Sequence, residues 1–134
     1  MYEYKHTVKL ADTDAAGVLF FANQFRIIHN AYETFMHLNG FSINRMLNQE
    51  KFRLPLVHAE ADYMLPINVS DELTIQVRVS KFTASSFTLK YAVYNKDILC
   101  GTASTSHVSI DVRTGNKIEL PEPIFRILET IYHK

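Results

Sequence analysis

The sequence contains little of several residue types that mark specialised classes of protein. It has one cysteine, Cys100, no tryptophan, four glycines and four prolines among 134 residues. One cysteine excludes an intramolecular disulfide and any zinc site that needs several cysteines, and it fits a reducing compartment. So few glycines and prolines exclude collagen-like and low-complexity chains. We therefore expect residues 1–134 to fold throughout as a single cytoplasmic domain.

The sequence also lacks an excess of charge of either sign and any long hydrophobic run. Its 14 basic and 14 acidic side chains give a formal net charge of zero. Because nucleic-acid binders usually need a positive field that attracts phosphates, this balance argues against a nucleic-acid partner. No stretch approaches the roughly 18 apolar residues of a membrane-spanning helix, and the first residues lack the features of a signal peptide. We therefore expect no membrane partner.

What the sequence does contain is a clear order of periodic segments. Residues 2–10 alternate between apolar and polar side chains, which predicts a half-buried strand. Residues 23–38 repeat apolar side chains at helical spacing over about half the circumference, which predicts a mostly buried helix. Strand-like runs follow at 56–65, 72–83, 87–95 and 98–111, and Pro123 opens a short final helix. Short connections make these strands antiparallel neighbours, so we predict an α+β fold in which an antiparallel sheet curls around the helix.

Two carboxylates lie between the first predicted strand and the buried helix. Asp12 and Asp14 are two residues apart and are followed by Gly17. The start of a helix offers free backbone N–H groups that can hold an oxyanion, and a nearby carboxylate can act as a nucleophile or general base. The same carboxylates could instead order a turn or cap the helix. These residues alone leave both interpretations open.

Histidines provide further candidates for chemistry. His29, Glu33 and His37 follow one another at four-residue intervals, but His29 lies at the edge of the apolar face and the other two on the polar face, so we expect no metal site. His58 shares one side of a predicted strand with Glu60. An acid–base role for His58 and a hydrogen-bonded structural role are both compatible with this pattern.

A group of cations and hydroxyls surrounds one predicted hairpin. The group consists of Arg78, Lys81, Ser85, Ser86 and Lys90. These side chains could bind a phosphorylated ligand or could form a solvated strand end. The sequence has no phosphate-binding glycine-rich loop, no dinucleotide fingerprint and no G-x-S-x-G motif of a serine hydrolase. Nucleotide chemistry by those routes is therefore excluded.

The segment after the first strand carries a resemblance to a known family. It reads Asp12-Thr13-Asp14-Ala15-Ala16-Gly17-Val18-Leu19-Phe20-Phe21-Ala22-Asn23. A D-x-D-x-x-G element in this position resembles the hotdog-fold acyl-CoA thioesterases of the 4-hydroxybenzoyl-CoA thioesterase type. The similarity spans nearly the whole chain and includes the turn from Pro66 to Leu73 and the hairpin Ser85–Leu89. It implies a hotdog fold, in which a five-stranded antiparallel sheet wraps around a long central helix.

The resemblance also implies roles for particular residues. Asp14 falls on the family's catalytic carboxylate, the backbone N–H of Phe21 on the group that holds the thioester carbonyl oxygen, and Gly17 on a turn that substrate approaches closely. His58 becomes a possible assistant near the acyl group, and Asn23 a substrate-binding candidate. The remaining candidates for binding the CoA part are Arg78, Lys81, Ser85, Ser86 and Lys90. No cofactor is implied, since coenzyme A belongs to the substrate.

Finer features concern the substrate and the assembly. Within the family, the chain looks most like the 1,4-dihydroxy-2-naphthoyl-CoA hydrolases of quinone biosynthesis. This resemblance is carried by His29 and by the segments Phe21–Asn23, Ala31–Glu33 and Leu54–His58. Gln24 stands where several relatives have an aromatic residue. The resemblance implies a homodimer with two sites at the subunit interface, which usually pairs into a homotetramer. The alternatives are a short- or medium-chain acyl-CoA thioesterase, a hydratase or dehydratase acting on acyl thioesters, and a non-catalytic acyl-CoA binding module.

Overall fold

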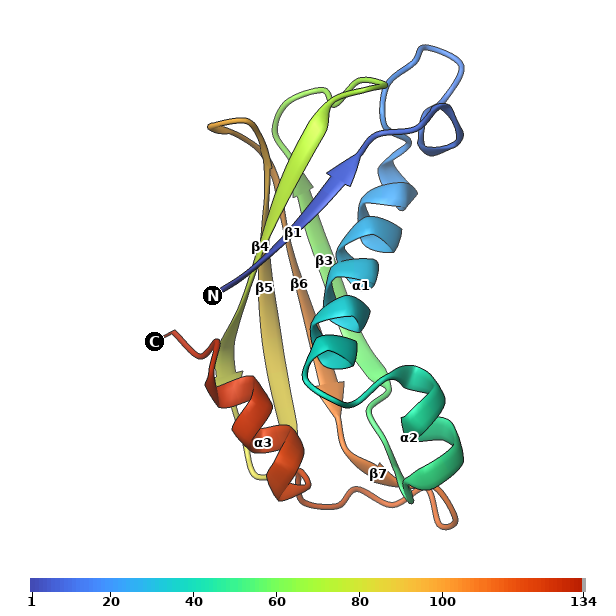
Figure 1. Cartoon of the computed structure of the whole chain (residues 1–134), viewed down its shortest axis with the longest axis vertical. Helices are drawn as coiled ribbons and strands as arrows, with labels where there is room; N and C mark the ends of the chain where they lie inside the picture. The colour runs from blue at the N-terminus through green and yellow to red at the C-terminus, as the bar shows by residue number, and fades with distance from the viewer. Residues whose placement is uncertain (134) are drawn as a thin grey trace.

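The computed structural model describes residues 1–133 and contains a five-stranded antiparallel sheet with the order β1-β4-β5-β6-β3 (Figure 1). The strands are β1 (Tyr2–Thr7), β2 (Phe52–Arg53), β3 (Leu56–Tyr63), β4 (Glu72–Phe82), β5 (Ser86–Asn95), β6 (Ile98–Val108) and β7 (Ile110–Asp111). The helices are the 3₁₀ turn η1 (Leu10–Asp12), α1 (Phe21–Leu38), α2 (Ile43–Gln49) and α3 (Glu122–Glu129). The predicted α+β class and its antiparallel five-stranded sheet are confirmed.

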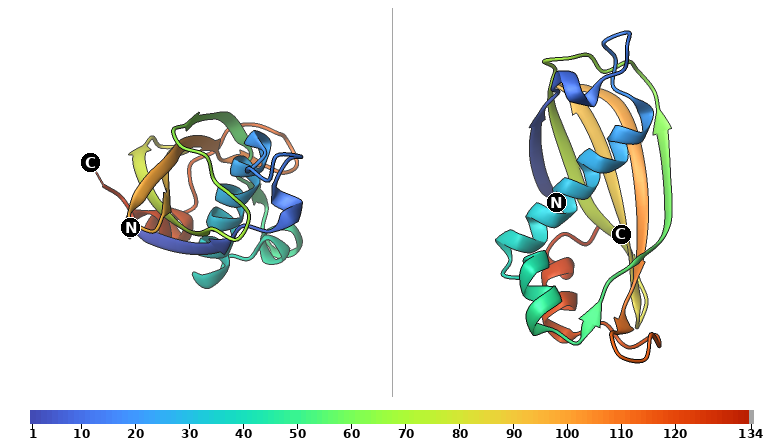
Figure 2. Two further views of the ribbon diagram at one scale, coloured as in Figure 1. Left: turned by 90° about the horizontal axis from the view of Figure 1, so that it is seen from above. Right: turned by 90° about the vertical axis from the view of Figure 1, so that its right-hand side faces the viewer.

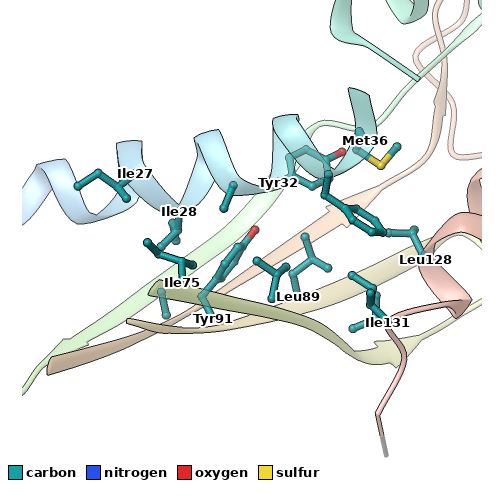
Figure 3. Close-up of a cluster of buried hydrophobic side chains, with 14 of the residues drawn as sticks. Ile27, Ile28, Tyr32, Met36, Ile75, Leu89, Tyr91, Leu128 and Ile131 are labelled. Carbon is teal, nitrogen blue, oxygen red and sulfur yellow. The ribbon is translucent and has the colours of Figure 1, made fainter. Parts of the chain in front are cut away.

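Helix α1 lies across one face of the sheet (Figures 1 and 2). Its buried side chains follow a helical stripe and comprise Gln24, Ile27, Ile28, Ala31, Tyr32, Phe35 and Met36. These residues face the inward side chains of β4 and β5, among them Ile75, Leu89 and Tyr91 (Figure 3). Burying a large apolar side chain contributes about 1.5–3 kcal/mol, so this layer is a main source of the hydrophobic stabilisation of the fold.

The two edges of the sheet differ in exposure. Strand β1 pairs with β4 along its whole length, with the register Tyr2↔Val77 to Thr7↔Glu72. Strand β3 forms the other edge and, like β1, has a single neighbour, but nearly all of its side chains are exposed whereas exposed side chains alternate with half-buried ones in β1. An unpaired strand edge presents free backbone N–H and C=O groups. Among residues 1–133, no helix combines the length and the apolar character that crossing a bilayer requires.

Besides shifts of one or two residues at other element ends, three differences from the expected elements have a local structural basis. The first strand ends at Thr7, because residues 10–12 turn into η1 instead of continuing the alternation. The segment 43–49, which shows no clear period, forms α2, and its N-cap Ser42 accepts a hydrogen bond from Arg45 N–H (3.1 Å). The last strand run divides into β6 and β7, since residues 110–111 leave the main sheet and pair with β2.

Candidate active site

Asp12 anchors the loop that connects β1 to α1. Its side chain is only 4% exposed. One carboxylate oxygen accepts hydrogen bonds from Lys9 N–H (2.8 Å) and His6 Nε2 (2.9 Å), and the other binds the guanidinium of Arg26. Burial alone would raise the pKa of Asp12, but these hydrogen bonds outweigh it and hold the pKa below its ordinary value. Asp12 is therefore an ionised, fully engaged structural carboxylate.

The backbone carbonyl of Asp12 positions the start of α1. It accepts hydrogen bonds from Phe20 N–H (3.1 Å) and from Asn23 Nδ2 (2.9 Å). Side chain and carbonyl together thus connect the end of β1, η1 and the first turn of α1. The amide nitrogen of Asn23, a predicted substrate-binding residue, is engaged in this contact, so its role toward substrate stays a prediction.

Asp14 lies in the same loop but in a different environment. Its side chain is exposed, and Oδ1 accepts hydrogen bonds from Ala16 N–H (2.8 Å) and Val18 N–H (3.4 Å). Within residues 1–133, no hydrogen bond engages Oδ2 of Asp14. Gly17 closes the turn with a φ of 77°, and a Cβ built there meets nothing within 4 Å. The loop therefore holds one oxygen of Asp14 in place and leaves the other without a hydrogen bond in the described residues, while the space around the Gly17 Cα stays open.

Helix α1 begins at Phe21 without a side-chain cap. In the part of the chain that the structure describes, no acceptor binds the backbone N–H of Phe21, as is usual for the first residues of a helix. Its carbonyl accepts a hydrogen bond from the Tyr63 hydroxyl (2.8 Å), and the two rings meet edge to face with centroids 6.4 Å apart. The end of β3 thus fixes the first turn of α1 and leaves its positive end open.

A cavity of about 340 Å³ opens beside Phe21. Its walls come from Val18, Leu19, Phe21 and Gln24 and from residues 63–67. Apart from the Gln24 amide and the Tyr63 hydroxyl, the lining side chains are apolar. A free carboxylate oxygen, an open helix start and an apolar cavity therefore lie at one end of the protein, shown at the top of Figure 1.

The other predicted residues lie elsewhere in the chain. His58 is exposed near the start of β3, where Nε2 is 3.8 Å from a carboxylate oxygen of Glu60. Tyr63, which touches Phe21, is five residues further along β3, or about 17 Å. His58 therefore does not meet Asp14 within one chain, and its assisting role stays a prediction.

The predicted CoA-binding group is spread over β4 and β5. Arg78 and Lys90 are direct cross-strand partners and line a hollow of about 420 Å³ on the sheet face opposite α1. Lys81 follows a bulge in β4, and Ser85 and Ser86 lie at the β4–β5 turn. Figure 1 shows this turn at the end of the molecule remote from the loop before α1. One chain does not bring these residues to Asp14, so their role in binding substrate stays a prediction.

Sequence reasoning did not single out Tyr63 or Arg26 as parts of this site, nor assign Gln24 a role in it. The available signal was Gln24, a polar residue inside the apolar stripe of the helix, where a buried side chain must find hydrogen-bond partners. Tyr63 binds Phe21, 42 residues away along the chain, and Arg26 binds Asp12, 14 residues away. No local sequence pattern predicts contacts of that separation.

A carboxylate with a free oxygen and a helix-start N–H that can hold an oxyanion are the groups that acyl-transfer chemistry requires. Residues 8–128 match the model of the Thioesterase-like superfamily, and the chain belongs to that superfamily. A 1,4-dihydroxy-2-naphthoyl-CoA hydrolase of Nostoc punctiforme is 36% identical over 129 residues, covering 96% of this chain and 87% of the relative.

A second relative and a solved structure agree with this assignment. The 1,4-dihydroxy-2-naphthoyl-CoA hydrolase of Picosynechococcus is 36% identical over 126 residues, covering 90% of this chain and 86% of the relative. The crystal structure of a 1,4-dihydroxy-2-naphthoyl-CoA thioesterase from Synechocystis superposes with a TM-score of 0.89 at 31% identity, covering 95% of this chain and 94% of that one.

Proposed function

We propose that this protein hydrolyses an aromatic acyl-CoA thioester, and that 1,4-dihydroxy-2-naphthoyl-CoA is its substrate. The relatives that carry this activity in their names support the choice of substrate. The observation that carries the reaction type is the pairing, in one loop, of a carboxylate with an unengaged oxygen and the unengaged N–H of Phe21 at a helix start.

The proposed mechanism uses the two groups in different roles. The N–H of Phe21 donates a hydrogen bond to the thioester carbonyl oxygen, where negative charge develops during attack. Oδ2 of Asp14 either attacks the carbonyl carbon, forming an anhydride that water then cleaves, or takes a proton from an attacking water molecule. In both routes the carbon–sulfur bond breaks, coenzyme A leaves as a thiolate, and the acyl group is released as a carboxylic acid. The proposed reaction uses water and no cofactor.

We further propose the hotdog arrangement, with the sheet curled around α1 as the long central helix, and a homodimer that can pair into a tetramer (Figure 2). The unpaired edge of β3 supports this assembly, because such an edge is a template for pairing with a second copy. Arg78 and Lys90 lie in a hollow on the sheet face opposite α1 and not at the Asp14 loop, so they would need a second subunit to meet a substrate bound at that loop.

The experiment that tests the function measures thiol release from a panel of aromatic and aliphatic acyl-CoA substrates. We expect wild-type protein to prefer aromatic substrates and Asp14→Asn to lower kcat by about 10³, equivalent to about 4 kcal/mol of transition-state stabilisation. The asparagine keeps an oxygen that can accept from Ala16 N–H, so the loop should persist. Asp97→Asn, in the exposed β5–β6 turn, is the matched control and should keep full activity.

Three outcomes would contradict the proposal at different levels. Undiminished turnover by Asp14→Asn would remove Asp14 from the catalytic role while leaving the thioesterase activity intact. An absence of hydrolysis across the whole panel by folded wild-type protein would show that the reaction itself is wrong, and preferential hydrolysis of aliphatic substrates would show that the substrate class is wrong.

A further inference from the structure

Gln24 places a polar side chain in the otherwise apolar wall of the cavity beside Phe21. It lies one turn into α1 and is 2% exposed, yet it occupies a position in the stripe that packs against the sheet. The neighbouring polar group, the Tyr63 hydroxyl, already donates to the carbonyl of Phe21. The amide of Gln24 is therefore the group in this cavity whose hydrogen bonds remain to be accounted for.

The orientation of this amide follows from its partners. Nε2 donates to the backbone carbonyl of Thr102 (3.2 Å) and more weakly to that of Asp62 (3.4 Å). Carbonyl oxygens only accept hydrogen bonds, so the NH₂ side must face β6 and β3. Gly101 leaves the space that this requires, because a Cβ built there would lie 2.8 Å from Oε1 and 3.0 Å from Nε2.

Oε1 of Gln24 is left as an unengaged acceptor. Within residues 1–133, no hydrogen-bond donor lies within reach of Oε1. Oε1 is not among the fully enclosed side-chain atoms without a partner, since in that part of the chain Ser109 Oγ is the atom of this kind. Any accessible surface that Oε1 keeps lies within the 2% of Gln24 that is exposed, and Gln24 borders the cavity. A buried acceptor without a partner lowers the affinity of whatever covers it by about 10- to 100-fold.

We infer that Gln24 determines acyl-group specificity, with Oε1 accepting a hydrogen bond from a hydroxyl on an aromatic acyl group. This inference rests on the proposed thioesterase function and deepens it. The cavity of about 340 Å³ has more than twice the volume of a cavity of about 150 Å³ that holds benzene, so it can take two fused rings. An aromatic group with a hydroxyl satisfies both the apolar walls and Oε1, whereas the same group without the hydroxyl leaves Oε1 unpaired.

The test is a cycle between Gln24 and the substrate hydroxyls. Values of kcat/KM are measured for 1,4-dihydroxy-2-naphthoyl-CoA and for 2-naphthoyl-CoA, with wild-type protein and with Gln24→Met, which keeps the length of the side chain but removes the acceptor. Because both proteins meet the same two substrates, differences in intrinsic reactivity cancel. We expect the preference for the hydroxylated substrate to fall by about 10- to 100-fold in Gln24→Met, through loss of activity on that substrate. Met64→Leu, in the same cavity wall, should leave the preference unchanged.

A wild-type arm keeps the inference testable if the variant does not fold, which thermal unfolding would reveal. The free acids 4-hydroxy-2-naphthoate and 2-naphthoate are compared as competitive inhibitors, and we expect the hydroxylated acid to bind at least about tenfold more tightly. Active variants with an unchanged preference, or equal inhibition by the two acids, would overturn the role of Gln24 while leaving the thioesterase proposal standing. Failure of wild-type protein to hydrolyse either thioester would overturn both.

Discussion

Replacing Asp12 with asparagine probes the carboxylate that holds the loop in front of α1. The native oxygens accept hydrogen bonds from Lys9 N–H, His6 and Arg26. Asparagine keeps one acceptor oxygen and turns an NH₂ group toward donors that it cannot satisfy. The substitution also removes the negative charge that Arg26 faces. We expect the loop to loosen and the folded state to lose stability.

The magnitude follows from the number and exposure of the hydrogen bonds that the substitution removes. A hydrogen bond to a charged group contributes about 1.5–3 kcal/mol. The ion pair with Arg26 contributes at or below the low end of this energy range, because the arginine side chain is 47% exposed and water screens the interaction. Since the substitution also breaks one hydrogen bond on the buried side, the free energy of unfolding should fall by about 3 kcal/mol. For an m-value of about 2 kcal/mol/M, the urea midpoint should drop by about 1.5 M.

The pH dependence of unfolding provides an independent measurement on the same variant. Because the pKa of Asp12 lies below its ordinary value of 3.8 in the folded state, the ionised carboxylate contributes stability that is fully present above pH 3.8. That contribution is lost as the pH falls through the folded pKa. Wild-type protein should therefore lose stability below pH 3.8 more steeply than Asp12→Asn.

Urea titrations of wild type, Asp12→Asn and Asp14→Asn make up the assay, followed by circular dichroism. The exposed Asp14 is the control and should change the midpoint by less than about 0.5 M, because one amide oxygen still accepts from the turn. A shift below about 0.3 M for Asp12→Asn would refute the structural role argued for this carboxylate. So would identical acid unfolding of Asp12→Asn and wild type.

Two further predictions concern the assembly and the core. Sedimentation equilibrium should find wild-type protein as a dimer or tetramer. Val57→Lys, on the exposed edge of β3, should weaken this association at least about tenfold. A monomeric wild type at micromolar concentration would contradict the proposed assembly. Burial lowers the pKa of His107 from 6.5 to about 4, so the folded state favours the neutral imidazole. The resulting stability, about 3 kcal/mol, is fully present above pH 6.5 and is lost as the pH falls from 6.5 to 4. Unfolding of His107→Gln should lack this slope, and a slope equal to that of wild type would show that another group titrates.

The strands and α1 were predictable because their burial follows a period that the sequence displays. In β4, Leu73, Ile75, Val77 and Val79 alternate with half-exposed residues and are each at most 1% exposed. Helix α2 was not predictable in this way. It buries only Met46 among seven residues, so it has no apolar stripe, and the N-cap Ser42 is its main local signal.

The candidate site was only partly predictable, for a different reason. The spacing of Asp14, Gly17 and the helix start is local, and the resemblance assigned these residues directly. The cavity is not local, because it forms where the end of β3 meets the first turn of α1, more than 40 residues apart in sequence. The two serines at the β4–β5 turn lie at the end of the molecule remote from the Asp14 loop, so within one chain their predicted role in binding substrate stays a prediction.

The two aspartates of the loop differ in what their oxygens leave free. A carboxylate whose oxygens are both engaged, as in Asp12, is held ionised and immobile, and a reaction at either oxygen would first have to break hydrogen bonds that support the fold. Asp14 keeps one oxygen engaged, which fixes the side chain, and one unengaged, which can act on substrate. Because the residue type is identical, only the partners distinguish the two, and those of Asp12 are His6 of β1, Arg26 of α1 and the N–H of Lys9. Accounting for each hydrogen bond therefore assigns the structural role to Asp12 and makes Asp14 the carboxylate for which a catalytic role is open.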